Sequence, residues 1–99
     1  MESTTRSKPM SFLMTRKRSD IDIMAKILGK ANEGTKKTRI MYRCNLSHKQ
    51  LQVYLQILLD MKLLVTSKKK EDPKTNYFRT TSKGFRFLAA YRTLRGLMT

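Results

Sequence analysis

The sequence has one cysteine, Cys44, and one histidine, His48. A single thiol cannot close a disulfide within the chain, and these two side chains are too few to hold a structural zinc ion. We therefore expect no metal site and no cofactor. We interpret Cys44 as a small buried hydrophobic residue rather than a reactive thiol, since free cysteine is among the most frequently buried residue types.

Acidic residues are also scarce, with seven aspartates and glutamates against 22 lysines and arginines. The acids form no pair placed for acid and base catalysis, and the four glycines are too scattered to build a phosphate-binding loop. His48 has no nucleophile near it, so a groove or phosphate contact suits it better than the role of a base. These absences predict that the protein is not an enzyme.

A long apolar run is missing as well. No stretch approaches the roughly 20 residues of a membrane-spanning helix. The apolar residues 12–14 are too few for a signal peptide and are followed by three basic residues. We expect one small domain of 99 residues that stays in the cytoplasm, associated with the nucleoid, and that binds neither a membrane nor a small-molecule substrate.

What the chain has in excess is positive charge. Its formal net charge is +15 and its isoelectric point is about 10.5, so its surface attracts polyanions, and salt weakens that attraction. Nucleic acid is the expected partner class. Residues 1–18 carry five of the basic residues and no sustained periodicity. We interpret residues 1–17 as a flexible arm, either tracking phosphates or simply solvated, with Met10 and Met14 as alternative starts.

The stretch 46–64 organises the rest of the chain. Ser47 is a good N-cap, and nothing from residue 48 to residue 64 breaks a helix. Helical spacing places on one side the residues Leu51, Tyr54, Leu55, Leu58 and Leu59. It places on the other side Lys49, Gln52, Val53, Gln56 and Asp60. Such groups bind base edges and thymine methyls, so we interpret 47–61 as a recognition helix, with an ordinary solvated face as the alternative.

Two shorter helices are expected before this one. Ser19 caps the first, whose apolar residues are Ile23, Met24, Ile27, Leu28 and Ala31, and Gly34 closes it. The polar interval 35–38 has room for a short strand. A second, short helix follows with Ile40, Met41 and Cys44 as its apolar residues. A short helix, a tight turn and a longer capped helix with a polar face form the helix-turn-helix pattern.

Beyond Leu64 the composition favours two short strands around a polar loop. Because Pro73 cannot sit inside a strand, we expect the strands to stop on either side of it, leaving a basic loop that projects as a wing, residues 66–76. Its basic side chains are Lys68, Lys69, Lys70 and Lys74. Phosphate contact is the functional interpretation, and a solvated loop that discourages edge pairing is the alternative.

The last helix, capped by Thr81 or Ser82 and running to about Met98, has apolar residues on two sides. Phe85, Leu88 and Ala89 share one side. The other carries the heptad-spaced Phe87, Tyr91, Leu94 and Met98. Because a small domain covers only one side of a helix well, we expect the second stripe to form a homodimer interface. The alternative is that it folds back on the first helix or the arm.

Together these elements resemble a winged helix-turn-helix domain, and more narrowly the archaeal ten-kilodalton winged-helix DNA-binding proteins, which are chromatin-associated or regulator-like dimers. Residues 18–28, 36–64 and 81–94 carry the resemblance. It implies a mainly α fold with a small β-hairpin, divided into an arm (1–17), a winged helix-turn-helix domain (18–80) and a C-terminal dimerisation helix (81–99). It also implies antiparallel pairing of that helix, which here is shorter than in some members.

The function that the resemblance implies is double-stranded DNA binding by a transcriptional regulator, with the recognition helix in the major groove and the wing on the phosphate backbone or minor groove. An architectural chromatin protein with little sequence preference and a protein-interaction module are the alternatives. The expected DNA contacts are Arg39, Arg43, Ser47, His48, Lys49, Gln50, Gln52, Val53, Gln56, Lys68, Lys69, Lys70 and Lys74.

Overall fold

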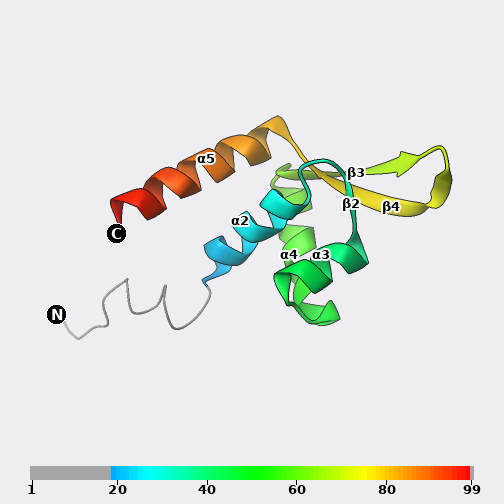
Figure 1. Cartoon of the computed structure of the whole chain (residues 1–99), viewed down its shortest axis with the longest axis horizontal. Coiled ribbons are helices and arrows are strands. Elements are labelled where there is room, and N and C mark those ends of the chain that lie inside the picture. Colours follow the sequence, from blue (N-terminus) through cyan, green and yellow to red (C-terminus); the bar gives the residue numbers. More distant parts are fainter. Residues whose placement is uncertain (1–18, 99) are drawn as a thin grey trace.

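The computed structural model of the chain describes residues 19–98 (Figure 1). Its elements are α2 (Asp20–Lys30), β2 (Thr35–Lys36), α3 (Lys37–Cys44), α4 (His48–Asp60), β3 (Leu64–Lys69), β4 (Asp72–Thr80) and α5 (Ser82–Leu97). In Figure 1, α5 runs above α2, α3 and α4 lie below it, and the β3–β4 hairpin projects beyond the helices. The predicted mainly α fold with a small hairpin is confirmed, whereas the predicted arm lies outside the described residues.

Capping boxes fix the starts of α2 and α4. Ser19 Oγ accepts from the amide of Asp22, and Ser47 Oγ accepts from the amide of Gln50, each at 3.1 Å. The side chains of Asp22 and Gln50 accept from the serine amides in return, so that orphan donors at both helix starts are satisfied. Both starts agree with the sequence prediction.

The core lies between the helices and one face of the sheet. Its fully buried side chains are Ile27, Leu28, Ile40, Cys44, Leu51, Leu58, Leu63 and Leu64. Burial of these apolar groups from three helices and a strand is the main force that holds the elements together. Cys44 is a buried residue, as predicted.

The sheet has the order β2-β4-β3 and is antiparallel, with β4 in the centre. The predicted short strand in the interval 35–38 is present as β2, whose Lys36 pairs with Tyr77. Gly34, with φ of +91°, makes the left-handed turn into this strand, which a residue with a Cβ adopts only with strain.

The prediction that the strands stop on either side of Pro73 is wrong. Strand β4 begins at Asp72 and runs through Pro73, leaving only Lys70 and Glu71 as the turn. The ladder between β3 and β4 changes register after Ser67, and β2 pairs only with the far end of β4. Proline is tolerated at such an irregular, edge-like position because no regular ladder requires its missing amide.

Helix α4 ends at Asp60 with Met61 as its C-cap, in agreement with the predicted helix over residues 47–61. Lys62 takes a left-handed conformation, with φ of +65°, and the chain turns so that Leu63 and Leu64 enter the core. Carbonyl groups at this turn bind the start of α5. The Thr81 hydroxyl donates to Lys62 O at 2.7 Å, the Thr81 amide to Leu63 O at 3.0 Å, and Lys83 Nζ to Met61 O at 2.9 Å.

Helix α5 therefore starts against the end of α4, with Thr81 as its N-cap as predicted. Leu88 is buried, but Phe85 and Ala89, expected on the same side as Leu88, are exposed. The side chains packed against the core are instead Phe87 and Tyr91, both from the stripe expected to face another subunit. A stripe at four- and three-residue spacing looks the same whether it faces its own domain or a partner.

Candidate nucleic-acid interface

The exposed face of α4 carries the residues that the sequence predicts for base contact. The exposed residues of this face are Gln52, Val53 and Gln56. The opposite face of the helix is buried in the core through Leu51, Leu55 and Leu58. His48 and Lys49 are exposed in the first turn, where the unpaired amides of a helix start favour a phosphate.

Two predicted contact residues on α4 are engaged in the helix itself. Gln50 Oε1 accepts from the Ser47 amide at 2.9 Å, and Ser47 Oγ accepts from the Gln50 amide. Both side chains are exposed at the helix start. The Ser47 hydroxyl and the Gln50 side-chain NH₂ keep their hydrogens for donation, so both remain able to contact a phosphate.

A hollow forms where α3, α4 and β4 meet, and we call it the inner hollow. Its lining residues are Lys36, Lys37, Thr38, Gln52, Lys74, Thr75, Asn76 and Phe78. It brings Gln52 from α4 together with Lys74 from the wing, two residues predicted from separate parts of the sequence. Lys37 Nζ donates to Gln52 Oε1 at 2.6 Å across this hollow.

A second hollow, the outer hollow, lies between α3 and the other side of the wing. It is lined by Gly34, Thr35, Lys36, Arg39, Arg43, Lys69 and Tyr77. It brings the two predicted arginines of α3 next to Lys69. Lys36 lines both hollows, so basic side chains continue from one to the other.

The wing is ordered by an acidic and aromatic cluster that extends to its turn, where Lys69 pairs with Asp72. Lys69 Nζ lies 4.3 Å from the centroid of the Tyr77 ring, and the Tyr77 hydroxyl donates to Asp72 Oδ2 at 3.2 Å. Lys36 Nζ lies 3.9 Å from the same carboxylate oxygen. Burial, the hydrogen bond to Asp72 and the negative charges of Asp72 and Glu71 raise the pKa of Tyr77, so its hydroxyl stays protonated and able to donate.

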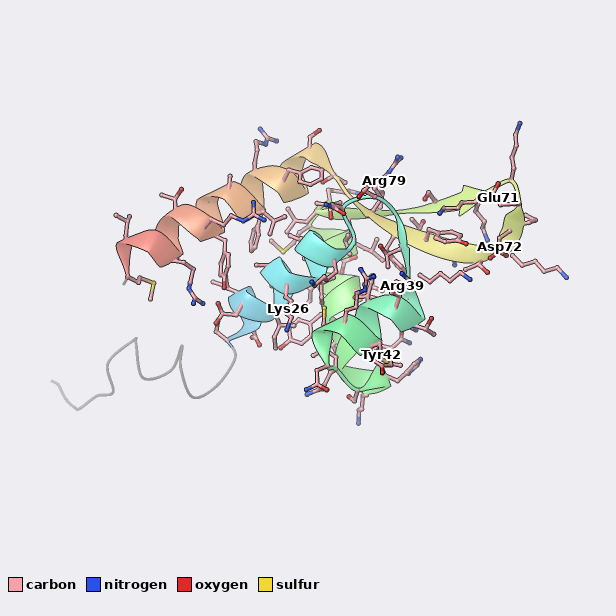
Figure 2. All side chains as sticks on the ribbon, viewed as in Figure 1. Lys26, Arg39, Tyr42, Glu71, Asp72 and Arg79 are labelled. Atoms are coloured by element: carbon pink, nitrogen blue, oxygen red, sulfur yellow. The ribbon has the colours of Figure 1, made fainter. Side chains whose placement is uncertain are left out.

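The charges on the wing are mixed. Lys68, Lys70 and Lys74 are exposed, and Figure 2 shows Glu71 and Asp72 at the far end of the same hairpin. Since Asp72 is held by Tyr77 and lies close to Lys36, its charge is partly compensated within the wing. The exposed lysines are then the groups that face outward to a polyanion.

The predicted sites omit Lys36, Lys37 and Asn76, which line the inner hollow. The first turn of α3 holds no acidic residue, and Lys37 is its first residue. A lysine at a helix start opposes the helix dipole, and this local cost is a sequence signal that the residue serves another contact. Asn76 gives no such signal, because only the hairpin register places it beside α3.

Tyr42 is a further residue that the sequence prediction passes over. It lies on α3 with 86% of its surface exposed, and it shares a shallow depression with Lys36, Arg39 and Arg43. Figure 2 shows Tyr42 and Arg39 on the same short helix. An exposed aromatic ring among basic side chains is suited to contact with sugar or base surfaces.

The predicted dimer residues are divided between two environments. Phe87 and Tyr91 are partly buried against the core, and Tyr91 donates through its hydroxyl to Asp22. Leu94 is 49% exposed, and Leu97, one turn further on, is 80% exposed. Met98 is half-buried. The exposed apolar surface therefore lies in the last two turns of α5, and it includes Leu97, which is not one of the predicted residues.

Residues 19–98 offer neither a cluster of metal ligands nor a helix suited to a membrane. No three side chains among the histidines, cysteines, aspartates and glutamates are grouped so that they could hold a metal ion. None of the described helices combines the length and the hydropathy that crossing a membrane requires.

Comparison with known proteins gives a family match and several similar structures. A family model described as winged helix-turn-helix matches residues 17–99. No curated protein matches the chain. The chain is similar to Sso10a-2, a DNA-binding protein from Sulfolobus solfataricus, with 20% sequence identity and a TM-score of 0.72 over 82% of each chain. The predicted winged-helix fold and the resemblance to archaeal winged-helix DNA-binding proteins are thereby confirmed.

Two other similar structures are larger proteins. S. aureus MepR, crystallised in complex with DNA, has 17% identity and a TM-score of 0.69 over 90% of this chain and 77% of its own. A variant of ZitR from Lactococcus lactis has 17% identity and a TM-score of 0.67 over 77% of this chain. The match covers 53% of that ZitR chain, so the present chain spans about half its length.

Proposed function

We propose that this chain, which belongs to the winged helix-turn-helix family, binds double-stranded DNA as a transcriptional regulator. In this proposal α4 enters the major groove, and the β3–β4 wing lies on the phosphate backbone or in the minor groove. The role is binding rather than catalysis. Two of the similar structures are a DNA-binding protein and a protein in complex with DNA, which supports the proposal.

The observation that carries the proposal is the inner hollow. There the exposed face of a capped helix lies beside lysines from two other elements, Lys37 from α3 and Lys74 from β4. A duplex presents base edges flanked by two phosphate backbones, and this arrangement of polar helix face and flanking cations matches that geometry. A net charge of +15 supplies the attraction that brings the two together.

We assign the contacts by their chemistry. Arg39, Arg43 and Lys69 at the outer hollow, together with the exposed wing lysines, hold phosphates and fix orientation. Gln52, Val53 and Gln56 face the base edges, while the α4 start, with Ser47, His48, Lys49 and Gln50, is placed for a phosphate or the first base. Lys36, Lys37 and Tyr42 are added to these contacts from the structure.

Titration of the protein with a fluorescent 20-base-pair duplex tests the proposal. If about six phosphates are neutralised, the logarithm of the binding constant falls with the logarithm of salt concentration at a slope near −5. Failure to bind in dilute buffer, or binding that salt leaves unchanged, would contradict DNA binding and would favour a protein-interaction module.

An architectural chromatin protein is the second candidate, because basic residues continue beyond the interface. Lys83, Arg86 and Arg92 are exposed on α5, and charge spread over several faces suits binding with little sequence preference. Selection of bound duplexes from a random pool separates the two roles. A defined consensus supports a regulator, and a flat pool supports the architectural role.

We further propose that the protein binds as a homodimer through the second half of α5. The exposed Leu94 and Leu97 form the apolar surface, with Met98 beside them and with Phe87 and Tyr91 at its inner edge. Apolar side chains as exposed as Leu97 gain stability when a second copy covers them.

A further inference from the structure

The two glutamines on the exposed face of α4 each have a charged partner, and the two partners have opposite sign. Lys37 Nζ donates to Gln52 Oε1 at 2.6 Å, and Gln56 Nε2 donates to Asp60 Oδ1 at 2.9 Å. All four side chains reach the surface, because Gln52, Gln56 and Asp60 are exposed and Lys37 is partly exposed.

These partners fix the orientation of each amide. An ammonium group has only donors, so the atom of Gln52 that it contacts must be the carbonyl oxygen. An ionised carboxylate has only acceptors, so the atom of Gln56 that it contacts must be the nitrogen. The usual ambiguity between the two ends of a glutamine amide is absent at both positions.

The orientation changes what each glutamine presents to a base. A glutamine without such a partner pairs with adenine, accepting from N6 and donating to N7. Beside Lys37, the oxygen of Gln52 lies next to a positive charge that repels the adenine amino group, and its NH₂ group is polarised into a stronger donor. Guanine offers two neighbouring acceptors, N7 and O6, to such a donor.

The partner of Gln56 has the opposite charge and strengthens the acceptor end of its amide. Its NH₂ group gives one hydrogen to Asp60, which polarises the amide oxygen into a stronger acceptor. The carboxylate also repels the acceptor atoms N7 and O6 of guanine. Cytosine, which presents only the N4 amino donor in the major groove, suits an acceptor beside a negative charge, as it suits aspartate or glutamate in other proteins.

We propose that Lys37 and Asp60 determine the sequence specificity of α4 by setting the two glutamines to opposite polarity. Gln52 acts as a donor that selects guanine over adenine, and Gln56 acts as an acceptor that selects cytosine. Four residues of helix span about 6 Å, so the two readings lie about two base pairs apart. This inference rests on the proposed DNA binding and names the sequence that α4 recognises.

Selection from a random duplex pool, followed by affinity measurements on single-base variants of the consensus, tests the inference. Gln52→Ala and Gln56→Ala first identify the two positions, since each flattens the preference at the base pair that its glutamine reads. At the Gln52 position we expect the wild type to prefer guanine over adenine by about two- to tenfold, the size of one net hydrogen bond. At the Gln56 position we expect a similar preference for cytosine over guanine.

Charge removal at the partners then tests the cause. Lys37→Met should abolish the guanine preference at the Gln52 position and admit adenine. Lys74→Met is the matched control, because it removes the same charge from the inner hollow. It should lower affinity for all sequences equally and leave the base preference unchanged. Asp60→Ala should likewise abolish the cytosine preference, whereas Glu33→Ala, which removes an exposed acid before β2, should not.

The outcomes separate this inference from DNA binding itself. If the wild type prefers adenine at the Gln52 position, or if Lys37→Met and Lys74→Met change base preference alike, the inference is overturned. A flat pool with tight, salt-dependent binding also overturns it while leaving DNA binding intact. Failure of the wild type to bind any duplex would overturn both. Circular dichroism confirms that each surface variant is folded.

Discussion

The hydroxyl of Tyr91 donates a hydrogen bond to Oδ1 of Asp22, which lies 69 residues earlier in the chain. Arg95 Nη1 lies 3.2 Å from the same carboxylate oxygen, and Asp22 also belongs to the capping box that starts α2. One carboxylate therefore joins the beginning of α2 to the second half of α5.

We predict that stability depends on the ionisation of Asp22. Burial disfavours its charged form, but hydrogen bonds from Tyr91, Ser19 and Arg95 outweigh burial and lower its pKa. Its stabilising effect is therefore fully present above the unfolded pKa of about 4 and is lost as pH falls through the lower folded value. Thermal denaturation between about pH 2 and about pH 7 should show this loss in the wild type, and Asp22→Asn should show less of it.

Tyr91→Phe separates the hydroxyl from the ring, which remains packed. We expect it to lower the free energy of unfolding at pH 7 by about 1–2 kcal/mol. Tyr54→Phe is the matched control, because the Tyr54 hydroxyl donates at 2.7 Å to Asp20 in an exposed position. Tyr54→Phe should lower the free energy of unfolding by less than Tyr91→Phe does. Equal losses in the two variants would show that the hydrogen bond between α5 and α2 stabilises the protein no more than an exposed one.

Gly84 is predicted to be irreplaceable for packing. A Cβ at this position would lie 2.4 Å from Leu63 O and 2.6 Å from Thr80 Cγ2, so Gly84→Ala must push α5 away from the end of α4. We expect a loss of about 1–3 kcal/mol in urea denaturation. Gly96→Ala in the same helix meets no atom within 4 Å and should be neutral or stabilising. A loss in Gly96→Ala as large as in Gly84→Ala would contradict this explanation.

The contribution of the wing to DNA binding should be measurable through the salt dependence of the binding constant. If Lys74 contacts a phosphate, Lys74→Ala should reduce the magnitude of the log–log salt slope by about 0.9. Arg92→Ala removes the same charge from α5, in the groove between α5 and α2, and should leave the slope nearly unchanged. If both variants change the slope alike, binding follows total charge rather than a defined wing contact.

The α5 surface should control assembly. The chain has a mass of 11.6 kDa, so we expect the wild type to sediment at twice this value and Leu97→Asp to sediment as a monomer with the same circular dichroism spectrum. Ala89→Asp introduces the same charge at an exposed position about two turns earlier in α5, outside the proposed interface, and should leave the dimer intact. A monomeric wild type at micromolar concentration would contradict the proposed interface.

Local signals in the sequence were sufficient to predict most of the helical part. Ser19 and Ser47 each precede an apolar pattern of helical period. At both positions, the capping hydrogen bonds and the burial of the apolar face favour a helix that starts at the same residue. The exposed face of α4 follows from the same periodicity. These features depend on residues within a few positions of one another, and the structure agrees with them.

Features that depend on pairing between distant residues were not predictable in this way. Whether Pro73 lies inside a strand depends on the register between β3 and β4, and whether Tyr91 faces its own domain depends on a carboxylate in α2. The contact between Lys37 and Gln52 likewise requires the turn between α3 and α4 to bring them together. Periodicity gives the direction of a side chain on its helix but does not identify its partner.

The hydrogen bonds from Thr81 and Lys83 to the carbonyls of residues 61–63 attach the end of α4 to the start of α5. In a symmetric dimer formed through α5, as we propose, two such attachments would fix the separation and relative tilt of the two copies of α4, with no flexible linker between them. Such a dimer would bind half-sites at only one spacing on the duplex. If a base pair were inserted between the half-sites, the two subunits could no longer bind both half-sites at once.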